Sequence, residues 1–311
     1  MRIIPGRVET FFFKTLTRIS PALNTKAYYR RKFGKKLDLN NPQTFNEKVL
    51  KLKLENYNSN PVVKQCADKY LVRDYVENIG CGELLVPLIA AYDNPNEIDW
   101  EALPDRFAMK WNFGCGFNIV CSDKNKLQRE NVVAQMRNWG GQSDYYLSHS
   151  EMQYKDVEKK IVVEEFLDDG KEKLPEDYKF YCMNGKCKTI LVCKDRVIGK
   201  KAKYYFMSPE WTLYPYSKEA IENPNEEIPK PNCIDKAIGY AEKLSSAFPF
   251  VRVDLYIIGE KIYFGELTFT PAAGMDMDLK IFPPNSSENV DTIFGRWLDI
   301  SHLDLVEREV R

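Results

Sequence analysis

The stretch that decides the fold is Val251–Met275, which reads VRVDLYIIGEKIYFGELTFTPAAGM. Apolar and polar residues alternate on both sides of a turn signal at Gly259, and this pattern predicts a β-hairpin. Regular alternation along the second strand places Glu266 on the same face as Phe264. Asp254, on the first strand, lies within cross-strand reach of Glu266.

These two acids point to a bound cation. A carboxylate on an apolar face is costly unless it is paired or bound to a metal, and two neighbouring carboxylates repel each other. Mg²⁺ carrying nucleotide phosphates would satisfy both acids, because it prefers hard oxygen ligands. An ordinary edge hairpin with solvated acids is the alternative that the pattern alone leaves open.

Length and composition describe a globular protein of common type. The chain has 311 residues, of which 44% are hydrophobic and 29% charged, enough for a large core and two or three subdomains. A net charge of zero gives no reason to expect a nucleic-acid partner. No run approaches the ~20 apolar residues that cross a bilayer, and no signal-peptide pattern is visible, so a cytoplasmic location is expected.

The eight cysteines are expected to be reduced thiols. None forms a CxxC pair, and only His149 and His302 could join them, so a zinc site is not expected. Most of the cysteines sit in apolar surroundings, as buried thiols do.

The first 36 residues are basic, with ten lysines and arginines against the single acid Glu9. Within them, Arg7–Ser20 predicts an amphipathic helix, and Tyr28–Lys36 is a basic, aromatic stretch. One interpretation is a helix on a membrane surface or docked on a partner, and the other is a helix packed on the body of the protein. The apolar positions of the helix are Val8, Phe11, Phe12, Leu16 and Ile19.

Two further helices are predicted downstream. Thr44 and Glu47 form a capping box that starts a helix running to about Leu54. Pro61 occupies a favoured first position and starts a helix that ends near Gly80.

The middle of the chain predicts a strand, a glycine-rich turn and a second strand. The strands are Arg106–Trp111 and Ile119–Cys121, and the turn Asn112–Asn118 reads NFGCGFN. A P-loop or a dinucleotide fingerprint needs a helix after the glycines, so neither is expected. A glycine-rich hairpin can still lay backbone N–H groups over phosphates, and Lys110 beside it could supply a charge.

The remaining elements complete an α+β pattern, with a loop or lid over Gly140–Tyr154 and a proline-rich surface excursion over Pro209–Pro231. Asn184-Gly185 is a strong hairpin turn signal. Helices are predicted over Leu127–Trp139, Cys233–Ala247 and Glu288–Ile300, and strands over Leu84–Ala91, Lys160–Leu167, Tyr178–Met183, Lys186–Lys194 and Lys201–Met207.

In this order, the pieces resemble the ATP-grasp superfamily and, within it, the TupA-like branch, named for teichuronopeptide biosynthesis. The resemblance runs from about Asn41 to Met275. It implies an α+β ATP-grasp fold in which two lobes clamp ATP, behind a helical N-terminal extension. The segments that carry it are FNEKVLKLKL, ADKYLVRDYV, KWNFGCGFNIV, DYKFYCMNGK, FPFVRVDLY and IYFGELTFTP.

The resemblance also implies a division of the chain into four parts. Residues 1–58 would be the helical extension and 59–100 a linking segment. Residues 101–168 would be the small lobe with its glycine-rich flap, and 169–311 the large lobe with the metal-binding hairpin and a C-terminal helix.

Nucleotide-binding residues follow from the resemblance as well. It implies two lysines on the phosphates, a glycine flap that closes over them, a hinge that reads adenine through main-chain groups, and an acid that holds the ribose. In that order, the residues are Lys69 and Lys110; Gly114, Cys115 and Gly116; Glu164, Glu165, Phe166 and Leu167; and Asp177.

For the metal and the chemistry, the resemblance points back to the hairpin. Asp254 and Glu266 match the metal-binding acids of the superfamily, while Thr268 stands where an asparagine is typical and could coordinate through its hydroxyl or carbonyl. Arg252 matches an arginine that stabilises the developing acyl phosphate, and Lys179 is expected to face the phosphates.

The implied activity is that of an ATP- and Mg²⁺-dependent carboxylate–amine ligase. The acid would be activated as an acyl phosphate, which needs charge neutralisation and positioning, and an amine would then attack it to form an amide. The family name suggests a sugar acid, such as a uronic acid unit, joined to an amino acid or amine during capsule or other surface-polysaccharide synthesis. The identity of both substrates and the oligomeric state stay open.

Three alternatives remain beside the ligase. A glycosyltransferase-like enzyme of capsule assembly needs an acidic DxD-type motif, and only Asp276-Met-Asp278 has that shape. A sugar kinase would use the same nucleotide site without an amine. A non-catalytic binding module derived from the fold would catalyse no reaction.

Overall fold

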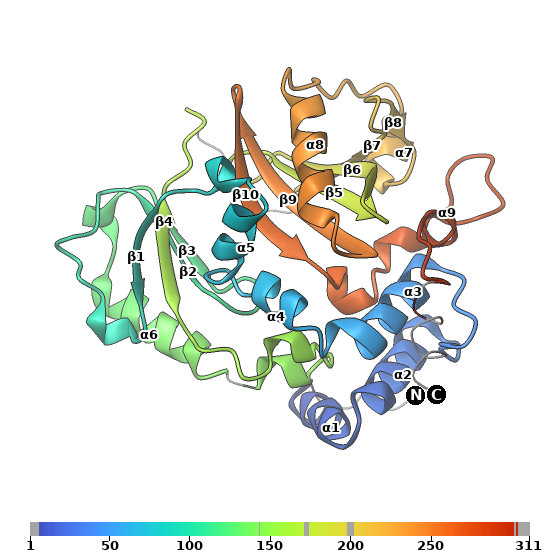
Figure 1. Ribbon diagram of the computed structural model, residues 1–311, viewed down its shortest axis with the longest axis horizontal. Helices are drawn as coiled ribbons and strands as arrows, with labels where there is room; N and C mark the ends of the chain where they lie inside the picture. Colours follow the sequence, from blue (N-terminus) through green and yellow to red (C-terminus); the bar gives the residue numbers. More distant parts are fainter. Residues whose placement is uncertain (1–5, 143, 171–173, 198–201, 302, 304–311) are drawn as a thin grey trace. The chain divides into compact units, whose positions relative to one another are not determined.

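The computed structural model describes residues 6–142, 144–170, 174–197, 202–301 and 303. The chain forms two compact units (Figure 1). Unit 1 consists of Met1–Tyr28 and Asn58–Asp168, and unit 2 of Tyr29–Tyr57 and Asp169–Arg311. Among the described residues, no helix is both long and apolar enough to span a bilayer.

Unit 1 is built on a four-stranded antiparallel sheet with the order β1-β4-β2-β3. Alternate residues of β2 are buried in the core that α6 (Arg129–Gly140) covers, among them Phe107 and Met109. Lys110 therefore points to the other face, which it shares with Val162 across the ladder. The strands are β1 Leu88–Tyr92, β2 Phe107–Trp111, β3 Asn118–Cys121 and β4 Ile161–Glu165.

The predicted helix from Pro61 to Gly80 is wrong, because the chain breaks there into α4 (Pro61–Ala67) and α5 (Val72–Asn78). The cause is Asp68. Its Oδ1 accepts hydrogen bonds from the backbone N–H groups of Tyr70 and Leu71, at 2.8 and 3.0 Å. Aspartate competes with helical hydrogen bonding in this way, and it ends one helix and starts the next.

Unit 2 is built on a six-stranded antiparallel sheet with the order β10-β9-β5-β6-β7-β8. Helix α8 (Ile234–Ser245) packs on one face, against alternate residues such as Val253 and Phe180. The opposite face carries Tyr181 and Phe250, which pack with α3 (Phe45–Leu52) and α9 (Val290–Trp297) through the rings of Phe45 and Phe294. The strands are β5 Asp177–Met183, β6 Lys186–Lys194, β7 Lys203–Met207, β8 Leu213–Tyr214, β9 Phe250–Ile258 and β10 Lys261–Thr268.

The decisive hairpin, β9–β10, is present with its turn at Gly259, but one prediction about its faces is wrong. A β-bulge interrupts the register between Phe264 and Glu266, so Phe264 lies opposite Leu255 while Glu266 lies opposite Asp254. The bulge residue, Gly265, approaches the Asp254 backbone so closely that a Cβ atom would lie 2.8 Å from its carbonyl oxygen. Glu266 therefore faces away from Phe264 and shares a face with Asp254.

The other predicted elements are present within about four residues of their predicted bounds, whereas the helix α2 (Pro21–Phe33) was not predicted. Asn184 and Gly185, with φ values of 52° and 74°, form the predicted hairpin turn, and Thr44 and Glu47 form the complete capping box. The strand predicted from Lys201 begins at Lys203, and residue 201 itself lies outside the described residues. The predicted excursion Pro209–Pro231 contains β8 and a short helix, α7.

The remaining helices complete the description. They are α1 Gly6–Ile19, α2 Pro21–Phe33, α3 Phe45–Leu52, α7 Lys218–Glu222 and α9 Val290–Trp297. Short 3₁₀ turns are Gly82–Leu84, Pro95–Glu97, Lys124–Lys126, Tyr145–Leu147, Met152–Tyr154, Pro271–Gly274 and Asp278–Lys280, and Lys53–Tyr57 forms a π-helical turn after α3.

Candidate functional site

One face of the unit 2 sheet carries a row of charged side chains across three strands. Lys179 of β5 lies opposite Asp254 of β9, which in turn lies opposite Glu266 of β10. The Lys179 ammonium is 2.5 Å from a carboxylate oxygen of Asp254 and 2.5 Å from one of Asp177. Antiparallel register thus brings four of the predicted site residues together.

Arg252 connects this row to the end of the hairpin. Its guanidinium donates two hydrogen bonds to the Asp254 carboxylate, both at 2.7 Å, and a third to the Thr268 hydroxyl at 3.1 Å. The Thr268 hydroxyl donates to Glu266 at 2.8 Å, and the Arg252 guanidinium lies 3.7 Å from the same carboxylate. All five residues predicted for the metal and the chemistry therefore belong to one network. They are Lys179, Arg252, Asp254, Glu266 and Thr268.

The network is buried at its centre and open at its edge. Burial raises the pKa of Asp254, although Arg252 and Lys179 beside it act in the opposite direction. Burial lowers the pKa of Lys179, but the negative charges of Asp254 and Asp177 outweigh it and raise the pKa above its ordinary value. Lys179 is therefore protonated at neutral pH, and the exposed end of the network is Glu266.

Asp177 has an unused acceptor at this site. One carboxylate oxygen bonds Lys179, but Oδ1 is buried and has no hydrogen-bond partner in the described part of the chain. A buried acceptor without a partner is uncommon and marks a place where a water, an ion or a ligand group can bind.

The network offers oxygen donors of the type that Mg²⁺ prefers, in Asp254, Glu266 and Thr268. Among the described residues, no three Asp, Glu, His or Cys side chains are grouped as a metal site. The set contains only two acids, and Arg252 and Lys179 engage both oxygens of Asp254. The residues fit a hard cation by chemical type, with Glu266 the most accessible donor.

In unit 1, Lys110 of β2 and Glu164 of β4 lie on the same face of the sheet as diagonal neighbours. The Lys110 ammonium is 2.6 Å from the Glu164 carboxylate, whose other oxygen lies 3.2 Å from the Arg73 guanidinium. Arg73 also donates to the Val86 carbonyl at 3.0 Å. Two cations therefore share one acid, and this leaves positive charge at the end of β2. The sequence reasoning did not identify Arg73 as a site residue.

The glycine flap is tied to the break between α4 and α5. The Lys69 ammonium bonds the Gly114 carbonyl at 2.6 Å, and the Lys69 backbone N–H bonds the Asn112 carbonyl at 2.9 Å. The Asn112 side chain donates to Asp68 at 2.7 Å. Gly114 and Gly116 both have positive φ, 71° and 77°, which favours glycine. Lys69 and the flap, whose Cys115 is exposed, are therefore adjacent.

The predicted hinge follows β4, which ends at Glu165. The Glu165 N–H donates to the Pro87 carbonyl at 3.0 Å. The Arg106 guanidinium lies 4.1 Å from the centre of the Phe166 ring, and it pairs with Asp168. The chain at Glu165–Leu167 is thus anchored on both sides, and its role toward adenine stays a prediction.

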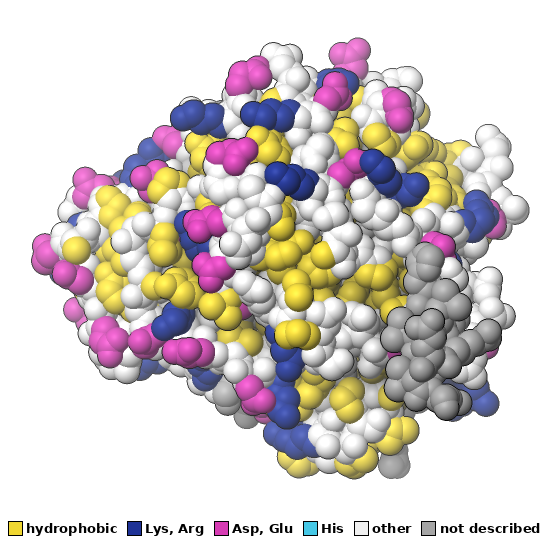
Figure 2. Space-filling view, viewed as in Figure 1, with side chains coloured by type: hydrophobic (Ala, Val, Ile, Leu, Met, Phe, Trp, Pro, Cys, Tyr) yellow, Lys and Arg dark blue, Asp and Glu magenta, His cyan; other side chains and the backbone are white. Residues whose placement is uncertain are grey.

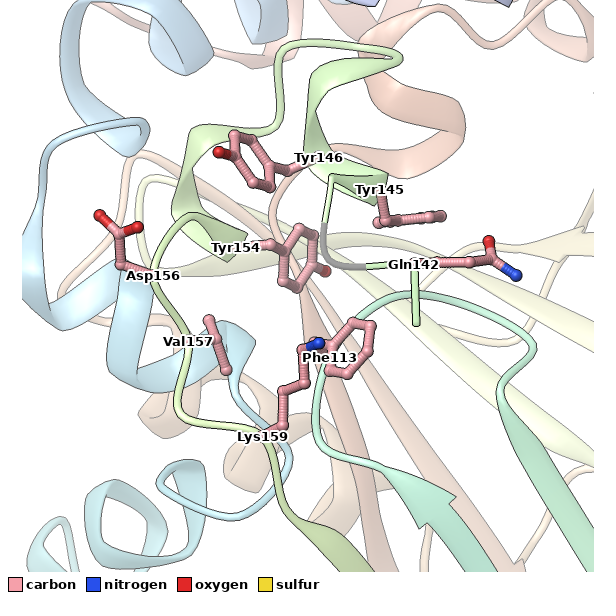
Figure 3. Close-up of a pocket in the computed structure, with 8 residues that line it drawn as sticks. All are labelled: Phe113, Gln142, Tyr145, Tyr146, Tyr154, Asp156, Val157 and Lys159. Atoms are coloured by element: carbon pink, nitrogen blue, oxygen red, sulfur yellow. The ribbon is translucent and has the colours of Figure 1, made fainter. Parts of the chain in front are cut away.

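A pocket of about 170 Å³ lies beside the flap within unit 1 (Figure 3). The predicted lid contributes Tyr145, Tyr146 and Tyr154, and Figure 3 shows the Lys159 side chain reaching toward the Phe113 ring. Gln142, Asp156 and Val157 complete its lining. None of the predicted site residues lines this pocket, so it is distinct from the two charged clusters.

The glycine flap, the lysines beside it and the acidic hairpin are features of an ATP-grasp protein. A comparison with protein families refines this class: the model described as TupA-like ATPgrasp matches residues 47–293, so the chain belongs to that family. The match confirms the family and the ATP-grasp fold class predicted from the sequence. The domain boundaries and the roles of individual residues stay predictions.

Solved structures of ATP-grasp proteins are similar to the chain. The ATP-grasp ligase PsnB complexed with minimal precursor is 14% identical, with 81% of this chain and 66% of that chain covered and a TM-score of 0.41. D-alanine–D-alanine ligase from Bacillus anthracis complexed with ATP is 12% identical, with 80% and 70% covered and a TM-score of 0.46. The chain thus spans about two thirds of the length of these proteins. A search of the curated proteins found no match.

Proposed function

We propose that the protein is an ATP- and Mg²⁺-dependent carboxylate–amine ligase that forms an amide through an acyl phosphate. The observation that carries this proposal is the network of Arg252, Asp254, Glu266, Thr268 and Lys179 on one sheet face of a TupA-like ATP-grasp chain. It combines hard oxygen donors with two fixed positive charges, which is what phosphoryl transfer to a carboxylate requires.

Within this proposal, each residue of the network has a separate task. Asp254, Glu266 and Thr268 would hold Mg²⁺, which neutralises phosphate charge when bound. Arg252 would stabilise the negative charge that develops on the acyl phosphate, and Lys179 would contact the transferred phosphate. Because both cations are already held by Asp254, little reorganisation is needed when a phosphate arrives.

The nucleotide would be held by the remaining predicted residues. Lys69 and Lys110 would contact the phosphates, and the backbone of Gly114, Cys115 and Gly116 would cover them. In this arrangement Lys110 exchanges the Glu164 carboxylate for a phosphate, while Arg73 keeps Glu164 in place. The main chain of Glu164–Leu167 would read adenine, and Asp177 would hold the ribose.

The proposed substrates are a sugar acid, such as a uronic acid unit, and an amino acid or small amine. The family name supports a role in capsule or teichuronopeptide-like polysaccharide synthesis. The proposed location is the cytoplasm, with peripheral contact at the inner face of the membrane, where surface polysaccharides are assembled.

The test is ADP release by the full chain with ATP and Mg²⁺, screened across a panel of uronic acids and amino acids. ADP is expected only when both an acid and an amine are present, and Glu266→Gln is expected to abolish it. If calorimetry detects no binding of ATP to the protein at millimolar ATP, the proposal is wrong. ADP formed with the sugar alone, together with a phosphorylated sugar, would show a kinase instead.

The two alternatives other than the kinase, a binding module and a glycosyltransferase, predict different results. A binding module predicts that Glu266→Gln changes nothing that can be measured. In the glycosyltransferase alternative, Asp276 and Asp278 would carry the metal, and Asp278→Asn would abolish activity. The ligase proposal gives Asp278 no role, so Asp278→Asn is expected to leave ADP release intact.

A further inference from the structure

Helix α1 presents an apolar face to solvent. The side chains of Phe11, Phe12 and Ile19 are 69%, 50% and 69% exposed, and Leu23 at the start of α2 is 52% exposed. These four residues are called the N-terminal apolar patch below. Single exposed apolar side chains are normal on protein surfaces, but four within thirteen residues mark an interaction site.

The exposed face is not a sign of a loosely attached helix. The opposite side of α1 packs on unit 1 through Phe13, which is buried and lies edge-on to the Tyr28 ring at 4.7 Å. Thr17 is also buried and donates to the Leu147 carbonyl at 2.6 Å, and Lys14 pairs with Asp144 at 2.7 Å. The helix therefore packs on the body of the protein, but Phe11, Phe12 and Ile19 of the apolar stripe predicted from its sequence are exposed.

Two positive charges lie next to the patch in the chain. Arg18 precedes Ile19 and is exposed, with its guanidinium 3.6 Å from the Asp144 carboxylate. Lys26 lies one turn after Leu23 and has no acidic partner among the described residues. Figure 2 shows hydrophobic side chains next to Lys and Arg side chains at the lower edge of the view, where Figure 1 draws α1 and α2. Residues 1–36 contain ten lysines and arginines against one acid, in a chain of zero net charge.

We propose that the N-terminal apolar patch docks on an anionic lipid bilayer, with its four apolar side chains in the boundary between headgroups and acyl chains. Apolar rings and aliphatic chains flanked by cations are the pattern of helices that lie in this boundary. Each lysine or arginine near an anionic surface adds to the attraction. A protein partner or a second copy of the chain would need acidic side chains placed opposite these cations. The headgroups of an anionic bilayer provide negative charge at every position on its surface.

The experiment is co-sedimentation of the full chain with vesicles of phosphatidylcholine alone or mixed with phosphatidylglycerol. Binding is expected only to the anionic vesicles and is expected to fall as salt is raised. The double variant Phe11→Ser/Ile19→Ser is expected to weaken binding by more than about tenfold, from the loss of two apolar side chains. Phe282→Ser is the matched control, because Phe282 is 57% exposed and lies outside the patch.

A charge variant tests the electrostatic part separately. Lys26→Glu is expected to weaken binding to anionic vesicles by about fivefold or more, whereas Lys126→Glu, at an exposed lysine of unit 1, leaves it unchanged. Circular dichroism melting of each variant verifies that the chain is folded.

The proposal is overturned if the chain binds neutral and anionic vesicles equally, or if the patch variant binds as well as its control. It is also overturned if the patch variant instead converts a dimer to a monomer in sedimentation, since the patch would then be an interface between copies. ADP release with soluble substrates does not depend on vesicles, so failure here leaves the ligase proposal standing.

Discussion

Asp254 is the residue on which the charged network depends. Both of its oxygens are bonded to cations, and it is buried between Arg252 and Lys179. Removing one partner of a buried ion pair leaves an uncompensated charge away from water. Glu266 belongs to the same network but lies at its open edge, where water can replace a lost interaction.

Substitutions of the two acids are therefore expected to have different effects on the free energy of unfolding but the same effect on ADP release. Asp254→Asn should lower the free energy of unfolding by roughly 3–5 kcal/mol, because Arg252 loses its buried partner. Glu266→Gln should change it by less than about 1 kcal/mol, since its ion pair is exposed, while both variants lose ADP release. Urea denaturation measures the first effect. Equal destabilisation by the two substitutions would contradict the assignment of Asp254 as the structural centre.

At the scale of elements, two departures from regular structure position the site. The break at Asp68 places Lys69 against the glycine flap, and the bulge at Gly265 turns Glu266 toward Asp254. A continuous helix or an unbroken strand would separate these groups. The sequence indicates the helix break and the bulge only weakly, because an aspartate is tolerated in many helices and a glycine in many strands.

Asp68→Ala is expected to loosen the flap. The substitution removes two hydrogen bonds from the N–H groups of Tyr70 and Leu71, which lie between α4 and α5, together with the bond from Asn112. We expect a loss of about 2 kcal/mol in unfolding free energy and faster hydrogen exchange of the flap amides. Asp74→Ala on the exposed side of α5 is the control. Unchanged exchange in Asp68→Ala would show that the flap is held by other contacts.

Gly265→Ala is expected to destabilise unit 2 although alanine suits most secondary structure better than glycine. Its Cβ atom would meet the Asp254 carbonyl oxygen at 2.8 Å and the Tyr256 ring at 3.3 Å, and relieving this overlap should lower the unfolding free energy by about 1–3 kcal/mol. Gly239→Ala in α8 is the matched control. It has open space around it and should gain roughly 0.5–1 kcal/mol. Urea midpoints of the two variants should move in opposite directions.

At the scale of the whole molecule, unit 2 joins two distant parts of the chain. Asn46 at the capping box of α3 joins these parts, because its backbone N–H donates to the Asp291 carboxylate at 2.8 Å. Within the first part, Glu47 of the same capping box accepts hydrogen bonds from Lys35, Gln43 and Tyr29 at 2.7, 3.0 and 2.8 Å. Burial alone would raise the pKa of Glu47, but these bonds outweigh it and hold the pKa below its ordinary value.

A pKa that is lower in the folded state makes stability depend on acid. Glu47 contributes stability above its ordinary pKa of 4.5, and this contribution disappears as the pH falls through the folded value. Between pH 6 and pH 3, wild-type protein should therefore lose more unfolding free energy than Glu47→Gln, by roughly 1 kcal/mol. Urea denaturation at both pH values measures the difference. Parallel losses in the two proteins would show that Glu47 is not linked to acid unfolding.

Much of this molecule could be predicted from its sequence, because the deciding signals are local. The order of motifs predicted the family and the α+β class, and the turn at Asn184, the capping box at Thr44 and the hairpin at Gly259 follow from short patterns. Contacts between distant residues were harder. That Arg73 shares Glu164 with Lys110, or that α1 leaves Phe11, Phe12 and Ile19 exposed, depends on packing that no local pattern contains.

The bulge at Gly265 makes the strand one residue longer than simple alternation requires. If residue 265 were deleted, Phe264 and Glu266 would become neighbours and would still point to opposite faces, so Glu266 would remain beside Asp254. Shortening the chain at this position should therefore disturb the protein less than adding one methyl group to it. The urea midpoint of the deletion variant should lie above that of Gly265→Ala. At position 265, we therefore expect the hairpin to tolerate the loss of one residue better than the addition of one methyl group.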